Sequence, residues 1–130
     1  MELVEAGFKP NQETYELKSV EGGVVTLRRL NHGESNELTD LRLSLQLNTA
    51  DDDEERETSA KTTIRLSRQY SFNKAIVDHN LARNGKKFNL KKRRDVDELD
   101  PLIGDEIAEL IDKHNEKIEG TDDIPNSEEN

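Results

Sequence analysis

The sequence predicts an α+β domain built from a small antiparallel sheet of two β-hairpins and about three helices. Three observations support this fold class. Two glycines, Gly22 and Gly23, separate short runs with strand character, leucines alternate with polar residues over residues 41–47, and apolar residues recur at helical spacing over residues 100–119. Side chains alternate between two faces along a strand, whereas a helix returns to one face every three to four residues.

The first hairpin is predicted over residues 14–29. The turn sequence SVEGG ends in two glycines, which adopt positive φ angles at no steric cost. A short helix is expected over residues 31–40. Capping-type residues open that segment, and Glu34 and Glu37 lie in its early positions, where acidic side chains are favoured.

A second hairpin is expected farther along the chain. The leucines of residues 41–48 alternate with Arg, Ser and Gln, which is typical of a half-buried strand. Residues 61–67 alternate again, so the two segments could pair. Between them, residues 49–60 contain DDDEERE, and self-repulsion of these like charges predicts a solvated acidic loop.

The period then changes to that of a helix over about residues 68–82, which carries the apolar side chains Tyr70, Ile76, Val77 and Leu81. After it, Asn84-Gly85 predicts a two-residue turn with both residues at positive φ. Residues 86–90 are expected to form a short strand or an ordered loop.

The last helix is predicted over residues 100–119. Asp100 can cap it, and Pro101 suits the first helical position, where a missing N–H costs nothing. Gly120 is a natural stop. Its apolar stripe consists of Ile103, Ile107, Leu110, Ile111 and Ile118.

These elements form one predicted domain over residues 14–120. Residues 1–13 are expected to be a flexible arm, and residues 121–130 (TDDIPNSEEN) a disordered acidic tail. The chain has no Trp, two Tyr and three Phe. Its core must therefore be built mainly from Leu, Ile and Val.

Composition argues against several classes of function. The chain contains no Cys, which excludes disulfides and thiolate metal ligands. A net charge of −10 argues against nucleic acid as the main partner, because phosphate contacts need clustered Lys and Arg. No run approaches the roughly 20 apolar residues of a membrane-spanning helix, and MELVEAGFKP lacks the basic start of a signal peptide. We therefore expect no membrane partner.

No catalytic, metal or cofactor motif is recognisable. His32, His79 and His114 lie in three separate predicted elements, and no HExxH-type spacing accompanies them. The serines lack a GxSxG elbow, no phosphate loop is present, and the acidic triplet at residues 51–53 lacks the Gly and Glu positions of an EF-hand. We therefore expect no enzymatic activity and no cofactor. A pocket that joins His79 and His114 would reopen the alternative of a small hydrolytic or metal-dependent enzyme.

Two features could contact a partner. The basic run KKFNLKKRR, residues 86–94, is the one local reversal of charge; it could pair with the acidic helix 100–119, an acidic protein or phosphate, and the acidic surroundings favour protein. The apolar stripe of the last helix is first of all a core face, part of which could stay exposed. The cations of the run are Lys86, Lys87, Lys91, Lys92, Arg93 and Arg94. The candidate apolar contacts are Leu102, Ile103, Ile107, Leu110, Ile111 and Phe88.

Three blocks of the sequence resemble the tail assembly chaperones of siphophages: IVDHNL (residues 76–81), NGKKFNL (84–90) and LDPLIGDEI (99–107). The segment VTLRRLNHGESNELTD (25–40) is similar to the strand-then-helix opening of these proteins. The resemblance implies a non-enzymatic protein that binds the phage tape measure protein and helps to recruit tail tube protein. It also implies that the apolar face of the last helix contacts tape-measure helices.

This chain departs from the family in its sparse aromatic residues, its basic run and its very acidic central segment. Under the resemblance, the protein acts in the host cytoplasm during phage assembly. The alternative is a phage virion component, such as a head–tail connector or a tail accessory protein, which would stay in the mature particle. Self-association into a homo-oligomer is left open.

Overall fold

The computed structural model describes residues 1–47 and 53–120, and its elements form the α+β fold that the sequence predicts. Three strands make one antiparallel sheet in the order β1-β2-β3, and β4 pairs with β5 in a second sheet. In chain order the elements are β1 (Glu13–Glu16), β2 (Val24–Leu27), α1 (His32–Leu47), α2 (Asp53–Ala75), β3 (Ile76–His79), β4 (Ala82–Arg83), β5 (Lys86–Lys87), α3 (Arg93–Asp97) and α4 (Pro101–Gly120).

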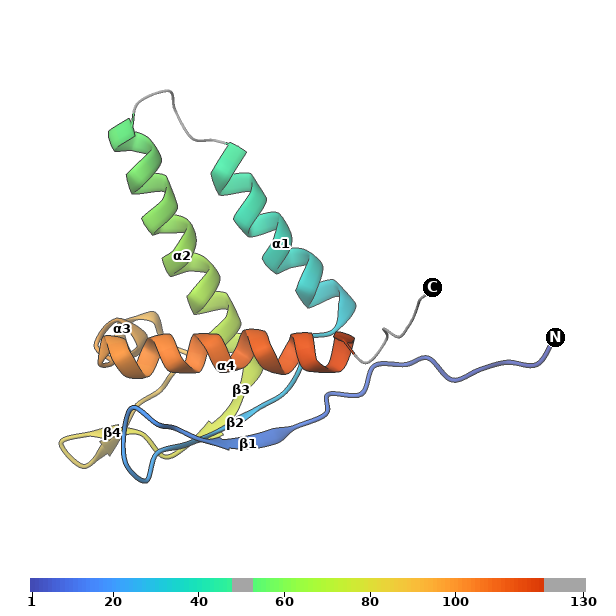
Figure 1. The fold of residues 1–130 in the computed structure, drawn as a ribbon, viewed down its shortest axis with the longest axis horizontal. Helices are drawn as coiled ribbons and strands as arrows, with labels where there is room; N and C mark the ends of the chain where they lie inside the picture. The colour runs from blue at the N-terminus through green and yellow to red at the C-terminus, as the bar shows by residue number, and fades with distance from the viewer. Residues whose placement is uncertain (48–52, 121–130) are drawn as a thin grey trace.

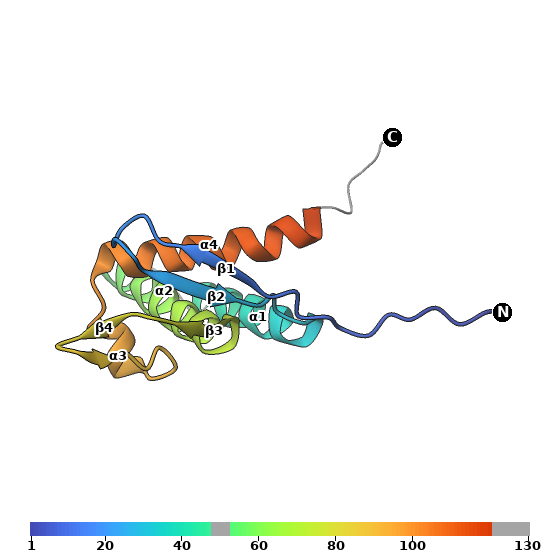
Figure 2. The same ribbon diagram turned by 90° about the horizontal axis from the view of Figure 1, so that it is seen from below.

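Figure 1 shows the three-stranded sheet below α4, which runs across the base of a helical hairpin formed by α1 and α2. In Figure 2, seen from below, the sheet lies in front of the helices, with β4 and α3 at one end and the N-terminal arm at the other. The core lies between the sheet, α2 and α4. Its largest buried apolar side chains, each at most 1% exposed, are Val25, Leu27, Phe72, Ile107 and Ile111.

The first predicted hairpin is confirmed. Strands β1 and β2 pair antiparallel, with Glu13 opposite Leu27 and Glu16 opposite Val24. In the connecting turn, Gly22 adopts a φ of 78°, a conformation that side chains with a Cβ rarely adopt. The turn therefore depends on the first of its two glycines for its backbone angle.

The second predicted hairpin is wrong, because both of its strands are helical. Residues 41–47 complete α1, and residues 61–67 lie inside α2. Of the expected acidic loop, residues 53–60 form the first turns of α2, and residues 49–52 lie outside the described residues. Leucine, arginine and glutamine favour helix, and residues 41–47 contain no β-branched side chain. Their leucines also recur every four residues, so the same pattern fits a helix.

The helix predicted over residues 31–40 is the first part of α1. Asn31 and Glu34 form a reciprocal capping box: the Glu34 N–H donates to Asn31 Oδ1 at 2.8 Å, and the Asn31 N–H donates to Glu34 Oε1 at 3.0 Å. The Arg28 guanidinium donates to both oxygens of the same carboxylate, at 3.0 and 2.7 Å. These bonds fix where the helix begins.

The helix predicted over residues 68–82 ends at Ala75, so its last part is wrong. The following four residues form β3, which pairs antiparallel with β2 and completes the sheet. Ile76 is 4% exposed and Val77 is 42% exposed, which is the alternation of a strand with one buried face. Two adjacent β-branched side chains favour this extended backbone.

The signals that follow are confirmed. Asn84 and Gly85 adopt φ angles of 54° and 77° and connect β4 to β5. Helix α4 begins at Pro101, and Asp100 Oδ1 accepts a hydrogen bond from the Leu102 N–H at 2.9 Å. The short helix α3 between them was not predicted.

The N-terminal arm is only partly separate from the domain. The Arg29 guanidinium lies 5.5 Å from the centre of the Phe8 ring, and the Arg29 N–H donates to the Pro10 carbonyl at 2.9 Å. The Asn11 carbonyl lies 2.8 Å from Nε2 of the buried His114. The end of the predicted flexible arm is therefore anchored, while residues 1–7 are exposed and carry no regular structure.

Within the described residues, no helix is both long enough and apolar enough to cross a membrane. The predicted disordered tail, residues 121–130, lies outside the described residues.

Candidate partner-binding site

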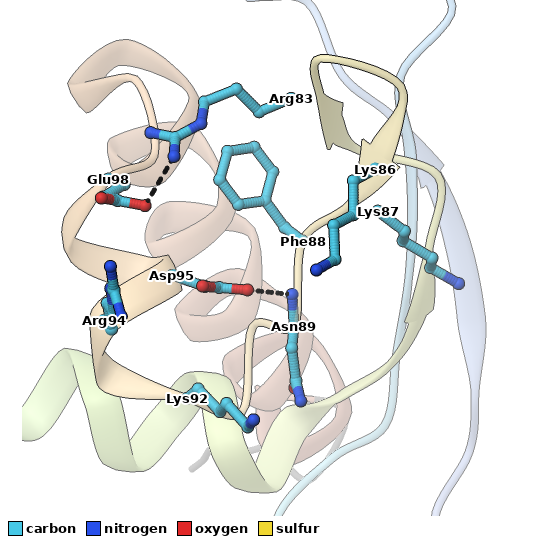
Figure 3. A pocket seen from close by; sticks show the side chains of 9 residues that line it. All are labelled: Arg83, Lys86, Lys87, Phe88, Asn89, Lys92, Arg94, Asp95 and Glu98. Carbon is cyan, nitrogen blue, oxygen red and sulfur yellow. Dashed lines mark hydrogen bonds and ion pairs between the residues drawn. The ribbon is translucent and has the colours of Figure 1, made fainter.

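A basic pocket of about 530 Å³ lies between the β4–β5 hairpin and α3. Figure 3 shows that side chains from both elements surround the ring of Phe88. Cations outnumber acids in its lining, which consists of Arg83, Lys86, Lys87, Phe88, Asn89, Lys92, Arg94, Asp95 and Glu98. In a chain with a net charge of −10, this pocket concentrates positive charge.

Both acids of the basic pocket are engaged within the protein. Glu98 pairs with the Arg83 guanidinium at 3.1 Å, and Asp95 Oδ2 accepts a hydrogen bond from the Asn89 N–H at 2.7 Å (Figure 3). Glu98 is paired with a cation, whereas Asp95 keeps its charge within the lining, where cations remain in excess.

Three of the pocket's cations lack a described partner. The side chains of Lys86, Lys92 and Arg94 make no hydrogen bond or ion pair with the residues whose side chains the structure describes, 1–43, 62 and 64–116. Lys87 differs, because its ammonium pairs with Asp78 on β3 at 2.8 Å. The pocket therefore presents unbalanced positive charge beside an aromatic ring, which is the chemistry of an anion-binding surface.

The basic run divides between this pocket and structural roles. Lys91 lies outside the pocket; its ammonium donates to the carbonyls of Asn73 at 2.7 Å and Ile76 at 3.1 Å, where α2 turns into β3. Burial, followed by repulsion from Arg28 and Lys74, lowers the pKa of Lys91. Among the described residues, the ion pairs of the run go to β3 and α3 and not to α4, which was one of the predicted partners.

An apolar groove of about 550 Å³ adjoins the basic pocket and shares Arg83, Phe88 and Glu98 with it. It runs between the SVEGG turn, β4 and the start of α4. Its apolar lining comes from Val20, Leu81, Phe88, Leu99 and Ile103, and polar side chains of Glu21, Asn80, Arg83, Glu98 and Asp100 also line it.

Hydrogen bonds hold the SVEGG turn in place from two sides. The Asn80 amide donates to the Gly22 carbonyl at 2.8 Å, and its oxygen accepts from the Val24 N–H at 2.8 Å. On the other side, the Glu106 carboxylate of α4 accepts from the N–H groups of Lys18 at 2.7 Å and Ser19 at 2.8 Å. The groove is therefore bordered by a fixed turn.

These hydrogen bonds change the pKa of the Glu106 carboxyl group. Burial is the largest single influence and raises its pKa, but the hydrogen bonds from Lys18 and Ser19 together outweigh burial and lower the pKa overall. The group is therefore ionised at neutral pH, where it holds the turn most strongly.

Gly23 sets the width of the groove on this side. A Cβ at this position would lie 2.7 Å from Val20 Cγ1 and 3.3 Å from the side chains of Leu17 and Leu81. Real Cβ atoms do not approach other atoms this closely, so any larger residue would push Val20 out of the wall.

Residues from three separate sequence blocks, 76–81, 84–90 and 99–107, meet at this apolar groove. Asn80 and Leu81 come from IVDHNL, Phe88 from NGKKFNL, and Leu99 and Ile103 from LDPLIGDEI. Spacing alone did not predict this meeting, because the blocks occupy β3, the β4–β5 hairpin and α4. The groove is therefore the place where residues of all three blocks can contact one ligand.

The candidate apolar contacts of the sequence analysis fall into three groups. Ile107 is 0% and Ile111 is 1% exposed, so both belong to the core and cannot contact a partner without unfolding. Ile103, Leu110 and Phe88 are half-buried against that core, and Leu102 is 72% exposed. Of this predicted set, Phe88 and Ile103 line the apolar groove.

The histidines do not meet in one pocket. His79 Nδ1 accepts a hydrogen bond from the Leu81 N–H at 3.0 Å, and burial lowers the His79 pKa. His114 is 2% exposed and hydrogen-bonds to Tyr15 Oη through Nδ1 at 2.7 Å. Across the part of the chain that the structure describes, no group of three His, Asp or Glu side chains is placed to hold a metal ion.

Sequence reasoning missed Arg83 in the basic pocket and Val20, Leu81 and Leu99 in the apolar groove. Arg83 could have been found, because the Asn84-Gly85 turn places it opposite Lys86. The groove residues carry no local signal, since they are ordinary apolar side chains that only the tertiary fold brings together.

The chain matches no protein-family model, and no curated protein or solved structure is detectably similar to it.

Proposed function

We propose that this protein is a phage tail assembly chaperone that binds the tape measure protein at the apolar groove. The observation that carries this proposal is the meeting of IVDHNL, NGKKFNL and LDPLIGDEI around one groove, described above. Local blocks that resemble a chaperone family and also form one surface are better explained by a shared ligand than by separate structural needs.

The groove has the chemistry that a helical, aggregation-prone partner requires. Its apolar lining can receive apolar side chains of an amphipathic helix, and its charged side chains can contact the polar face of that helix. The net charge of −10 favours the solubility of such complexes. Binding, and not chemistry on a substrate, is the activity that this arrangement supports.

The test is co-purification of the tape measure protein with groove variants. Ala82 lines the groove and is exposed on β4, so Ala82→Trp should obstruct the groove without disturbing the core. We expect this variant to lose the tape measure protein, and a matched Thr39→Trp variant, altered at an exposed position of α1, to retain it. Circular dichroism should show native helix content for both.

Retention of the tape measure protein by Ala82→Trp would overturn the assignment of the groove. Mass spectrometry of purified virions tests the function itself, since a chaperone should be absent from the mature particle. Stoichiometric presence there would instead identify a virion component, such as a head–tail connector or tail accessory protein.

A further inference from the structure

We propose that the basic pocket binds the acidic segment 121–130 of a second copy of this chain, so that copies associate head to tail. The pocket is distinct in chemistry from the apolar groove, and the proposal does not depend on the tape measure protein. It rests on the charge of the pocket, on the composition of the segment and on the position of the pocket along α4.

Charge complementarity selects the ligand class. Lys86, Lys92 and Arg94 face the pocket without partners among the described residues, and the two acids of the lining are already bonded to Arg83 and Asn89. Bringing uncompensated like charges together is unfavourable, and an anionic ligand relieves that repulsion. The volume of about 530 Å³ exceeds the needs of a single phosphate and suits several residues of a peptide.

The segment TDDIPNSEEN carries the matching groups. It contains four carboxylates and no cation, and Ile124 follows directly after Asp122 and Asp123. Two carboxylates beside one apolar side chain complement a pocket that combines cations with the half-buried ring of Phe88 (Figure 3). A long nucleic acid fits less well, because the rest of the surface is strongly negative and repels phosphate.

For Asp122 and Asp123, the carboxylates next to Ile124, distance favours a second copy over the same molecule. The pocket lies beside the start of α4, and residue 121 follows the far end of that helix, which has 20 residues and a length of about 30 Å (Figure 1). Asp122 and Asp123 can lie no more than about 10 Å from Gly120. They cannot reach their own pocket, but they can reach the pocket of a neighbour placed end to end.

Such a contact joins different surfaces of the two copies. Head-to-tail contacts of this kind continue into open chains unless their rotation happens to close a ring. We therefore expect the purified protein, without any partner, to self-associate weakly into oligomers whose average size increases with protein concentration.

Sedimentation velocity of the full chain tests this inference. We expect self-association at about 20 mM NaCl that is lost at about 500 mM, since the screening length falls from about 20 Å to about 4 Å. Charge reversal in the pocket, Lys92→Glu with Arg94→Glu, should weaken the association at least about tenfold. Charge reversal in the segment, Asp122→Lys with Asp123→Lys, should do the same.

The decisive sample is a mixture of the two reversed variants. Each alone should associate at least about tenfold more weakly than the native chain. Mixing them should restore association, because the native pocket of one variant can bind the native segment of the other, and the reversed pocket can bind the reversed segment. The matched control is Lys9→Glu with Arg42→Glu, which changes the net charge equally at exposed positions away from the pocket and should not weaken association.

Three results would overturn the proposal: a monomer at every salt concentration, association that the segment variant leaves unchanged, or a mixture that associates no more strongly than either variant alone. Fluorescence anisotropy with a labelled single-stranded oligonucleotide gives an independent readout. If the oligonucleotide binds, and Lys92→Glu with Arg94→Glu removes that binding, the pocket serves nucleic acid and the proposal is wrong. Loss of the tape measure protein from the Ala82→Trp variant would leave this result unaffected, so the two proposals fail separately.

Discussion

At the residue scale, His114 is the most constrained polar side chain of the core. Its Nε2 lies 2.8 Å from the Asn11 carbonyl, which can only accept, so Nε2 must carry the proton. In the neutral ring, Nδ1 then accepts from the Tyr15 hydroxyl at 2.7 Å. Burial and the nearby Glu13 raise the pKa of Tyr15, which keeps that hydroxyl protonated. One histidine thus ties the N-terminal arm and β1 to α4.

This arrangement predicts a specific cost for Tyr15→Phe. Removal of the hydroxyl leaves Nδ1 of a side chain that is 2% exposed without a donor, so the free energy of unfolding should fall by about 1–3 kcal/mol. Urea unfolding followed by circular dichroism measures it. The control is Tyr70→Phe, whose hydroxyl donates to an exposed Glu37 carboxylate that water can reach, and its cost should be smaller. Equal costs for both variants would contradict the assignment.

Glu34 makes stability depend on pH. The hydrogen bonds from the Arg28 guanidinium are the main reason why the Glu34 pKa lies below its ordinary value of 4.5. A carboxyl group with a lowered folded-state pKa contributes stability above its unfolded pKa, and this contribution is lost as pH falls through the folded pKa. The capping box should therefore be strongest at neutral pH and weaken in acid.

We accordingly expect Glu34→Gln to lower the free energy of unfolding by about 1–2 kcal/mol at pH 7. The difference from the native sequence should shrink as pH falls below 4.5. Urea unfolding at a series of pH values checks both statements. Glu109→Gln is the matched control, because that side chain is 69% exposed and pairs only with Lys113. A difference that grows in acid would be inconsistent with the lowered pKa.

At the scale of elements, local signals and tertiary contacts differ in what they reveal. Asn84-Gly85 and Asp100-Pro101 predicted a turn and a helix start correctly, because each acts through backbone angles and hydrogen bonds within a few residues. The alternating leucines of residues 41–47 were misassigned, because their spacing fits both a strand and a helix. The Asn31–Glu34 capping box and the helix preference of those residues decide between them.

The same distinction explains how much of the candidate site was predictable. The basic run was found from charge alone, and four of its cations line the basic pocket: Lys86, Lys87, Lys92 and Arg94. The sequence could not distinguish Lys91 from these four cations. In the structure its ammonium donates hydrogen bonds to the backbone carbonyls of Asn73 and Ile76 and does not line the pocket. The apolar groove could not be predicted, because its lining comes from separate segments of the chain and the packing between them produces no periodic pattern in the sequence.

Apolar side chains of helix α4 differ strongly in exposure, so substitutions on this helix should differ in their effect on stability. Ile107→Asp would place a charge where the native side chain is 0% exposed, and we expect it to unfold the domain by a cost of several kcal/mol. Leu102→Asp, one and a half turns earlier at a side chain that is 72% exposed, should leave the fold intact. Thermal unfolding followed by circular dichroism separates the two. A folded Ile107→Asp protein would show that this position is a contact surface and not core.

At the scale of the whole molecule, charge is unevenly distributed. The net charge is −10, yet the basic pocket gathers uncompensated cations at the end of the molecule that holds β4 and α3 (Figure 2). Repulsion among the remaining acids opposes compaction, while the exposed ion pairs contribute little. Screening should therefore relieve more repulsion than attraction.

We expect the Tm to rise by a few degrees between about 20 mM and about 200 mM NaCl. Differential scanning calorimetry at low protein concentration measures the change and keeps self-association out of the result. A Tm that falls with added salt would mean that attractive pairs, such as Arg28–Glu34 and Arg68–Asp105, dominate the electrostatic energy.

The two-sided attachment of the SVEGG turn has a consequence for recognition. Asn80 and Glu106 fix the backbone of this turn before any ligand binds. The conformational entropy of the turn is therefore already lost in the free protein. Little ordering remains to be done on docking, and the association should be rapid and change the host backbone only slightly.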